Sequence, residues 1–160
     1  MRLWHQYLIP YLDNQRILGQ HRECCALRGK GWGKKHSTVN YVFDHHISCL
    51  IQYHLLIMDE CRCRGFNIDN KWMQVNYRGK NILEFSSDII NNRSYFENIN
   101  LDAMCVPINN EHHINDIWIY PEHDLKYLYE CLNNLESKNV ELINGPSVAE
   151  LKLKLSILGI

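Results

Sequence analysis

The run of residues 45–64 constrains the fold of this chain more than any other segment. Its apolar side chains recur every three or four residues, the spacing of one face of an α-helix. The residues at this spacing are Ile47, Leu50, Ile51, His54, Ile57, Met58 and Cys61. Asp44 precedes the run as a candidate N-cap, and Gly65 follows it where glycine commonly ends a helix. We expect a central, largely buried helix here.

The rest of the chain predicts further helices joined by long loops. They are expected over residues 15–28, briefly near 84–92, and from Pro121 at the first helical position to Asn139. A last helix could begin at the capping box formed by Ser147 and Glu150, but the alternation of Leu and Lys over residues 151–155 fits a strand equally well. Frequent Asn and Asp and weak periodicity predict loops over most of residues 66–116. The expected fold class is mainly α, as one compact domain over residues 1–160.

Two segments are less regular. Residues 3–12 are largely apolar, but Pro10 opposes a long helix through them, so an extended or irregular arm packed on the body is expected. Residues 37–43 are β-branched and aromatic, which fits either a strand or a packed approach to the next helix.

The formal net charge of −1 hides an asymmetry between the two ends of the chain. Through His36 there are seven Lys and Arg against two Asp and Glu, a local charge of +5, whereas the remaining 124 residues carry ten against sixteen, a local charge of −6. An anionic partner would therefore be steered to the N-terminal part. The alternative is an ordinary solvated basic face.

Composition and cysteine spacing narrow the class of protein. No apolar run reaches the roughly 18 residues of a membrane span, and no signal-peptide pattern opens the sequence, so a cytoplasmic protein is expected. Seven cysteines then indicate reduced thiols. The groupings Cys24-Cys25 and Cys61-Arg62-Cys63 lack zinc-site spacing, and the adjacent pairs His45-His46 and His112-His113 would point about 100° apart on a helix. We expect no metal and no cofactor.

Residues 14–36 are the strongest candidate for function. After the predicted helix, three glycines alternate with cations and an aromatic residue: Gly29, Lys30, Gly31, Trp32, Gly33, Lys34 and Lys35. Such a loop suits a phosphate backbone and an unstacked base. Within the helix, Glu23 is the best candidate for a positioned carboxylate, although a simple salt bridge with Arg22 or a neighbouring cation is the commoner role for such a residue. His21 could contact phosphate.

Several motifs resemble one enzyme family. They are Met1-Arg2-Leu3-Trp4-His5, residues 18–29 (LGQHRECCALRG), residues 31–36 (GWGKKH), Tyr77-Arg78-Gly79-Lys80 and Ile119-Tyr120-Pro121-Glu122-His123-Asp124. Together they resemble the pyrimidine-dimer DNA glycosylase/AP lyases of the phage endonuclease V type, and most closely a bacterial branch of that family. The resemblance covers roughly residues 1–80 and 117–140.

The resemblance implies a chemistry and a set of residues. In that family the α-amine of the chain attacks C1′ of the damaged nucleotide and forms an imine, and a glutamate matching Glu23 stabilises the developing sugar cation. An α-amino group, with a pKa of about 7.7–8.0, is roughly one-tenth neutral at pH 7. Because Arg2 follows the initiator methionine, the amine would be that of Met1. The residues expected to bind DNA are Arg2, Gln15, Arg16, His21, Arg22, Arg28, Lys30, Trp32, Lys34 and Lys35.

The sequence therefore predicts a monomeric repair enzyme that acts on damaged double-stranded DNA. The lesion is left open, with pyrimidine dimers as one candidate, because the aromatic, lysine-containing tail of the family has no counterpart here. A DNA-binding protein with the same fold and no catalysis is the main alternative. An enzyme that uses its histidines on a small molecule is a more distant one.

Overall fold

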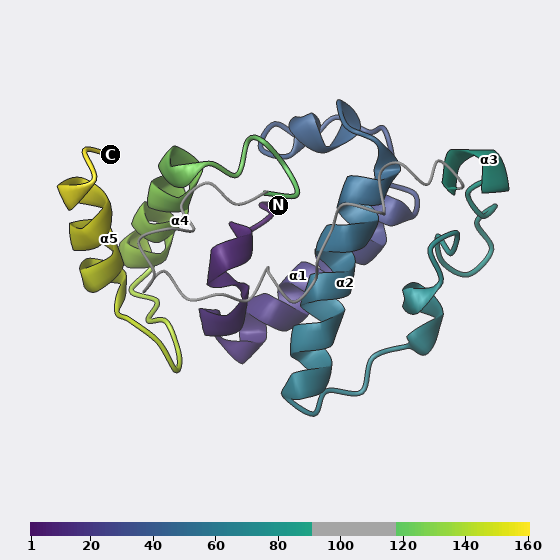
Figure 1. Ribbon diagram of the computed structural model, residues 1–160. Coiled ribbons are helices and arrows are strands. Elements are labelled where there is room, and N and C mark those ends of the chain that lie inside the picture. Colours follow the sequence, from purple (N-terminus) through teal and green to yellow (C-terminus); the bar gives the residue numbers. More distant parts are fainter. Residues whose placement is uncertain (91–117) are drawn as a thin grey trace. The chain divides into compact units, whose positions relative to one another are not determined.

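A computed structural model describes residues 1–90 and 118–160, and every regular element in these two ranges is a helix (Figure 1). The prediction of a mainly α fold is thus confirmed. The described residues divide into two compact units, treated separately below. Unit 1 contains Met1–Leu3 and residues 17–90, and unit 2 contains Trp4–Arg16 and residues 118–160. That the whole chain forms one domain stays a prediction.

Helix α2, Ile47–Cys63, is the predicted central helix, and most of its side chains are buried. Its start differs from the expectation, because the side chain of His46, not Asp44, accepts the backbone N–H of Ser48 as the cap. Asp44 instead follows a short 3-10 helix, η2, at Asn40–Phe43. At the other end Gly65 has a φ of +78°, the left-handed conformation expected of a glycine that ends a helix.

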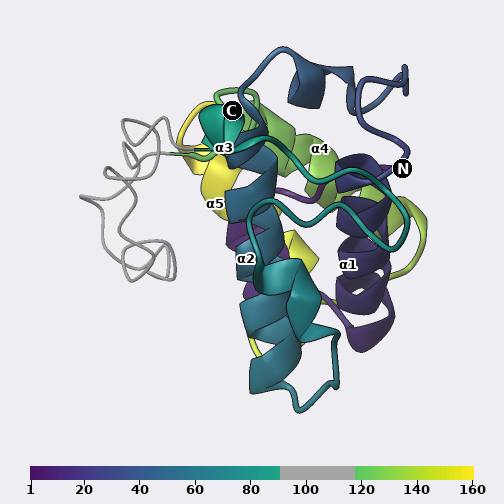
Figure 2. The same ribbon diagram turned by 90° about the vertical axis from the view of Figure 1, so that its right-hand side faces the viewer.

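Helix α1, Asn14–Arg28, confirms the prediction for residues 15–28. From Ile17 onward it belongs to unit 1, where it lies beside α2 (Figure 2). Ile17, Cys24 and Leu27 are fully buried, while Leu18 and Cys25 are partly exposed. Buried side-chain hydrogen bonds join the two helices, one of them from the Tyr53 hydroxyl to Gln20.

The rest of unit 1 is mostly loop, as expected. A 3-10 helix, η3, spans Asn70–Met73, and a single turn of α-helix, α3, spans Ser87–Ile90, where a short helix was predicted near 84–92. Residues 91 and 92 lie outside the described part. Residues 37–43 contain the 3-10 helix η2 and no strand.

In unit 2, residues Gln6–Tyr11 form a 3-10 helix, η1, that includes Pro10. The expectation of an extended or irregular arm was therefore wrong for residues 6–11. A 3-10 helix is short enough to tolerate a missing amide hydrogen. Trp4, Leu8 and Ile9 are buried, as expected of a packed segment.

Helices α4, Leu125–Ser137, and α5, Val148–Ile157, pack side by side in unit 2 (Figure 1). Asp124 caps α4, so Pro121 lies before the helix and not at its first position. The left-handed Asn139, with a φ of +51°, follows the end of α4 as predicted. The capping box of Ser147 and Glu150 is present at the start of α5. None of the helices that the structure describes has the length and apolar character needed to span a membrane.

Candidate active site at the N-terminus

The first three residues are held against unit 1 by their backbone. The Thr38 hydroxyl donates to the carbonyl oxygen of Met1, and Gln20 Nε2 donates to the carbonyl oxygen of Arg2 at 3.1 Å. Leu3 is fully buried, whereas Met1 is 45% exposed. Hydrogen bonds to the carbonyl oxygens of Met1 and Arg2 therefore anchor the start of the chain, while the Met1 residue stays exposed to solvent.

The half-buried carboxylate of Glu23 lies at the same place. It accepts hydrogen bonds from Gln20 Nε2, at 2.8 Å, and from the backbone N–H of Arg2. Burial raises the pKa of Glu23, while the positive charge of the N-terminal amine, the two hydrogen bonds and the Arg22 guanidinium oppose the rise. The structure thus brings together the two groups, Met1 and Glu23, that the sequence analysis expected to carry the chemistry.

Such a pair suits covalent catalysis at an electrophilic carbon. A primary amine can attack that carbon, and a carboxylate beside it can stabilise a developing cation or move a proton. A carboxyl group with a raised pKa exchanges its proton nearer to neutral pH than an ordinary one.

Unit 1 also carries several exposed cations. Arg22, Lys30, Lys34 and Lys35 are exposed and Arg2 is partly exposed. Two further residues expected to bind DNA belong to unit 2, where Gln15 is exposed and Arg16 makes an ion pair with Asp13. The loop after α1 therefore offers positive charge to an anionic ligand.

Arg28 does not belong to that surface, which corrects the expectation that it contacts DNA. Its side chain is fully buried, and its guanidinium donates to the carbonyl oxygens of Trp72, at 2.8 Å, and Gln74, at 2.7 Å. It also donates to the carbonyl oxygen of Tyr77 at 2.9 Å. Arg28 therefore holds the 72–77 loop against α1, a structural role that leaves no donor facing a phosphate.

Trp32 and His21 are also less available than the sequence suggested. The Trp32 ring is partly buried and packs edge-on against Phe43 and Phe85, with ring centroids 5.3 and 5.9 Å apart. His21 is partly buried and its Nδ1 lies 2.8 Å from His54 Nε2. Both residues contribute to packing, so a base or phosphate could reach only the part of each ring that stays exposed.

Among the described residues, His21, Cys25 and His54 form the one group whose ligand atoms gather closely enough to hold a metal, within 4.8 Å of one another. Arg28 argues against that use. Its Nη1 lies 3.1 Å from His54 Nδ1 and can only donate, so Nδ1 accepts and the proton of neutral His54 is on Nε2. His54 Nε2 therefore donates its proton to His21 Nδ1. Because Nε2 is the His54 nitrogen that faces the cluster, it has no free lone pair to bind a metal.

Sequence reasoning missed three residues of this site: Thr38, Gln20 and Tyr53. Gln20 precedes Glu23 by three positions, a spacing at which helix side chains meet, so this contact could have been suspected. Thr38 and Tyr53 lie far from Met1 and Gln20 in the sequence, and no local pattern marks them.

Two of the three comparisons with known proteins found nothing: no curated protein and no solved structure matches the chain. A family model described as pyrimidine dimer DNA glycosylase matches residues 1–74. The matched segment contains Met1, Gln20, Glu23 and Tyr53, together with the loop that carries Lys30, Lys34 and Lys35.

Proposed function

Because residues 1–74 belong to the pyrimidine dimer DNA glycosylase family, we propose that this chain is a DNA-repair glycosylase with AP-lyase activity. The α-amine of Met1 is the nucleophile and Glu23 is the catalytic carboxylate. One observation carries the proposal: the Glu23 carboxylate is hydrogen-bonded to the residue next to the N-terminus. It accepts from the backbone N–H of Arg2 and from Gln20 Nε2, and the same Gln20 nitrogen donates to the carbonyl oxygen of Arg2.

The reaction uses these two groups in order. The neutral amine attacks C1′ of the damaged nucleotide, the bond from C1′ to the base breaks, and the opened sugar is held as an imine on Met1. Glu23 stabilises the positive charge that develops at C1′. Loss of a proton from C2′ then expels the 3′ phosphate by β-elimination, which cuts the strand, and hydrolysis of the imine restores the amine.

The exposed cations of unit 1 bind the DNA backbone in this proposal. Arg2, Arg22, Lys30, Lys34 and Lys35 supply positive charge, and Gln15, Arg16, His21 and the accessible edge of Trp32 remain proposed contacts. An attack on C1′ requires access to a sugar that the duplex shields, so the DNA has to bend or a nucleotide has to leave the stack. The family suggests a pyrimidine dimer as the lesion.

The Glu23→Gln variant distinguishes this proposal from the alternative of a DNA-binding protein without catalysis. Strand cleavage and DNA affinity are measured for the variant and for the wild type. The assay uses a duplex with one thymine dimer and a second duplex with one abasic site. If the proposal is right, the rate of strand cleavage by Glu23→Gln should be at least about tenfold lower than that of the wild type, as expected when a catalytic acid–base group is removed. The affinity of the variant for DNA should stay close to that of the wild type. Equal absence of cleavage in the wild type and the variant, with tight binding by both, would favour the non-catalytic alternative.

A further inference from the structure

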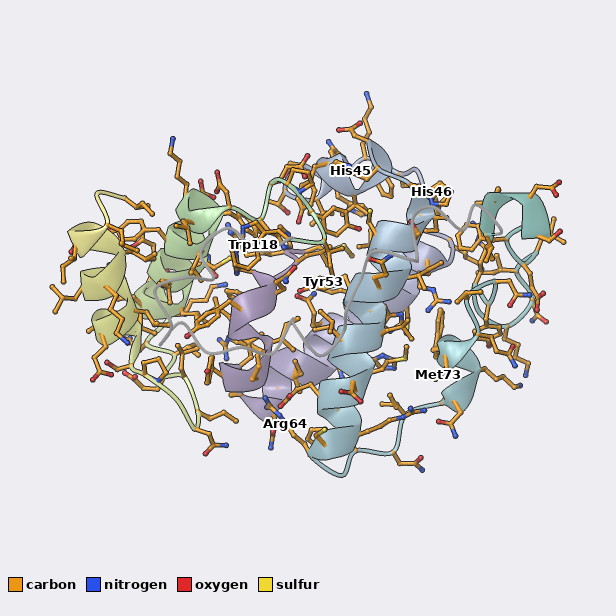
Figure 3. The ribbon with its side chains drawn as sticks, in the orientation of Figure 1. His45, His46, Tyr53, Arg64, Met73 and Trp118 are labelled. Carbon is orange, nitrogen blue, oxygen red and sulfur yellow. The ribbon has the colours of Figure 1, made fainter. Side chains whose placement is uncertain are left out.

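Tyr53 and Gln20 form a buried pair behind the candidate active site. Tyr53 lies midway along α2 (Figure 3) and is fully buried, and Gln20 on α1 is 1% exposed. The Tyr53 hydroxyl donates to Gln20 Oε1 at 2.9 Å. On its other side, Gln20 Nε2 donates to the carbonyl oxygen of Arg2 and to Glu23 Oε2, at 3.1 and 2.8 Å.

The chemistry of these partners fixes which way the amide of Gln20 faces. The Arg2 carbonyl and the Glu23 carboxylate only accept hydrogen bonds, so the amide nitrogen has to face them. The amide oxygen then faces Tyr53, whose hydroxyl has to donate. The reversed amide would place an oxygen against two acceptors, and a buried amide without matched partners costs about 1–3 kcal/mol per unsatisfied group.

We propose that Tyr53 and Gln20 are positioning residues that hold the Arg2 backbone and the Glu23 carboxylate at one fixed separation. The inference rests on the proposed function, in which the amine next to Arg2 and the carboxylate of Glu23 act on the same sugar. Tyr53 orients the Gln20 amide, and the two hydrogens of that amide reach the backbone of the nucleophile's neighbour and the catalytic carboxylate. Neither residue touches the reacting atoms.

The arrangement has a consequence for Glu23 that can be measured without DNA. A hydrogen bond to the charged form of a carboxyl group lowers its pKa. The groups that favour the ionised form of Glu23 are the N-terminal amine, the backbone amide of Arg2, Gln20 and Arg22, and they act against burial. Loss of the Tyr53 hydroxyl frees the Gln20 amide to turn, which weakens the Gln20 hydrogen bond to the Glu23 carboxylate and loosens the Arg2 backbone that donates to the same carboxylate.

The test is a carboxyl ¹³C NMR titration of Glu23 in the full chain, with its signal assigned by its absence in Glu23→Gln. Tyr53→Phe keeps the ring and removes the hydroxyl, and Gln20→Met removes the amide. The pKa of Glu23 should rise by about 0.5–1 unit in each variant. Tyr77→Phe, which removes a hydroxyl from a ring packed on Trp72 in the same unit, should leave it unchanged.

The outcomes separate this inference from the proposed function. An unchanged Glu23 pKa in folded Tyr53→Phe and Gln20→Met would overturn the inference, whatever the activity of the wild type. A raised pKa in both, with no borohydride-trapped adduct formed by the wild type, would support the hydrogen-bond arrangement and overturn the lyase. If the wild type forms the adduct, Tyr53→Phe should slow adduct formation about three- to tenfold at saturating DNA, with DNA affinity unchanged.

Discussion

Arg28 Nη1 lies 3.1 Å from His54 Nδ1, deep between α1 and α2. The same guanidinium also binds the backbone carbonyls of Trp72, Gln74 and Tyr77. Burial lowers the pKa of Arg28 to about 10, so the side chain remains charged at neutral pH. The positive charge of Arg28 is stabilised by carbonyl dipoles and not by an acidic side chain. The loop of residues 72–77 is in turn held in place by its hydrogen bonds to the Arg28 guanidinium.

Replacement of Arg28 should destabilise the protein strongly. Arg28→Met removes the donor of part-buried hydrogen bonds to the carbonyl oxygens of Trp72, Gln74 and Tyr77, and the expected loss is about 3 kcal/mol or more of unfolding free energy. Urea unfolding measures it, with Arg22→Met as the matched control because Arg22 is exposed. The control should change stability by no more than about 0.5 kcal/mol. A similar small effect for both variants would contradict the role given to Arg28.

The Arg28–His54 contact also predicts weak metal binding at His21, Cys25 and His54. Isothermal titration of the reduced protein with Zn²⁺ should show no tight, stoichiometric binding at this cluster, because Arg28 holds the acceptor nitrogen of His54 away from it. One equivalent of tightly bound Zn²⁺ that disappears in His21→Ala would show that the hydrogen-bond order inferred here is wrong.

His5 predicts how stability depends on pH. Its Nδ1 accepts from the Tyr7 backbone N–H and its Nε2 donates to the carbonyl of His123, so the ring is neutral. Burial lowers the pKa of His5 to about 4 and that of His123 to about 3. The unfolded chain, with histidine pKa values near 6.5, therefore binds protons that the folded chain does not. The contribution of these two histidines to the free energy of unfolding is therefore fully present above about pH 6.5 and is lost as the pH falls towards 4.

Urea unfolding at several pH values between 7 and 4.5 checks this expectation. Each of the two histidines should contribute up to about 1.4 kcal/mol per pH unit in the window between its two pKa values. His5→Gln keeps a donor and an acceptor but does not titrate, so its stability should fall less steeply with decreasing pH. An equally steep fall in that variant would remove His5 from the explanation.

Lys34 and Lys35 should account for part of the salt dependence of DNA binding. Each phosphate contact contributes about 0.9 to the slope of log affinity against log salt, so Lys34→Gln/Lys35→Gln should flatten the slope by up to about 2. Lys126→Gln/Lys138→Gln removes the same charge from exposed positions on and after α4 and should leave the slope unchanged. Equal slopes for both double variants would exclude the loop after α1 as a DNA-binding surface.

The helices were predictable from sequence where local chemistry determines them. The apolar period of residues 47–61, the glycine at 65 and the capping box of Ser147 and Glu150 are all short-range signals, and the structure confirms each one. Pro10 shows the limit of such signals. It argues against a long α-helix but does not distinguish an extended segment from the 3-10 helix that forms.

The site was predictable only in part. A family resemblance indicated Met1 and Glu23, and the structure brings them together. Arg28 and Lys30 belong to the same basic stretch, yet Arg28 is buried and Lys30 is exposed. The two residues differ because the backbone carbonyls of Trp72 and Gln74, some 45 residues later in the chain, bind the guanidinium of Arg28. Composition and spacing hold no information about such long-range partners.

Borohydride trapping is the most direct test of the central claim that the Met1 amine is the nucleophile. The protein is incubated with a duplex containing one abasic site and reduced, and the adduct is digested and mapped by mass spectrometry. We expect a covalent adduct on residue 1 that is absent when the N-terminus is acetylated, while DNA binding is retained. An adduct on a lysine, or one that persists after acetylation, would contradict the claim.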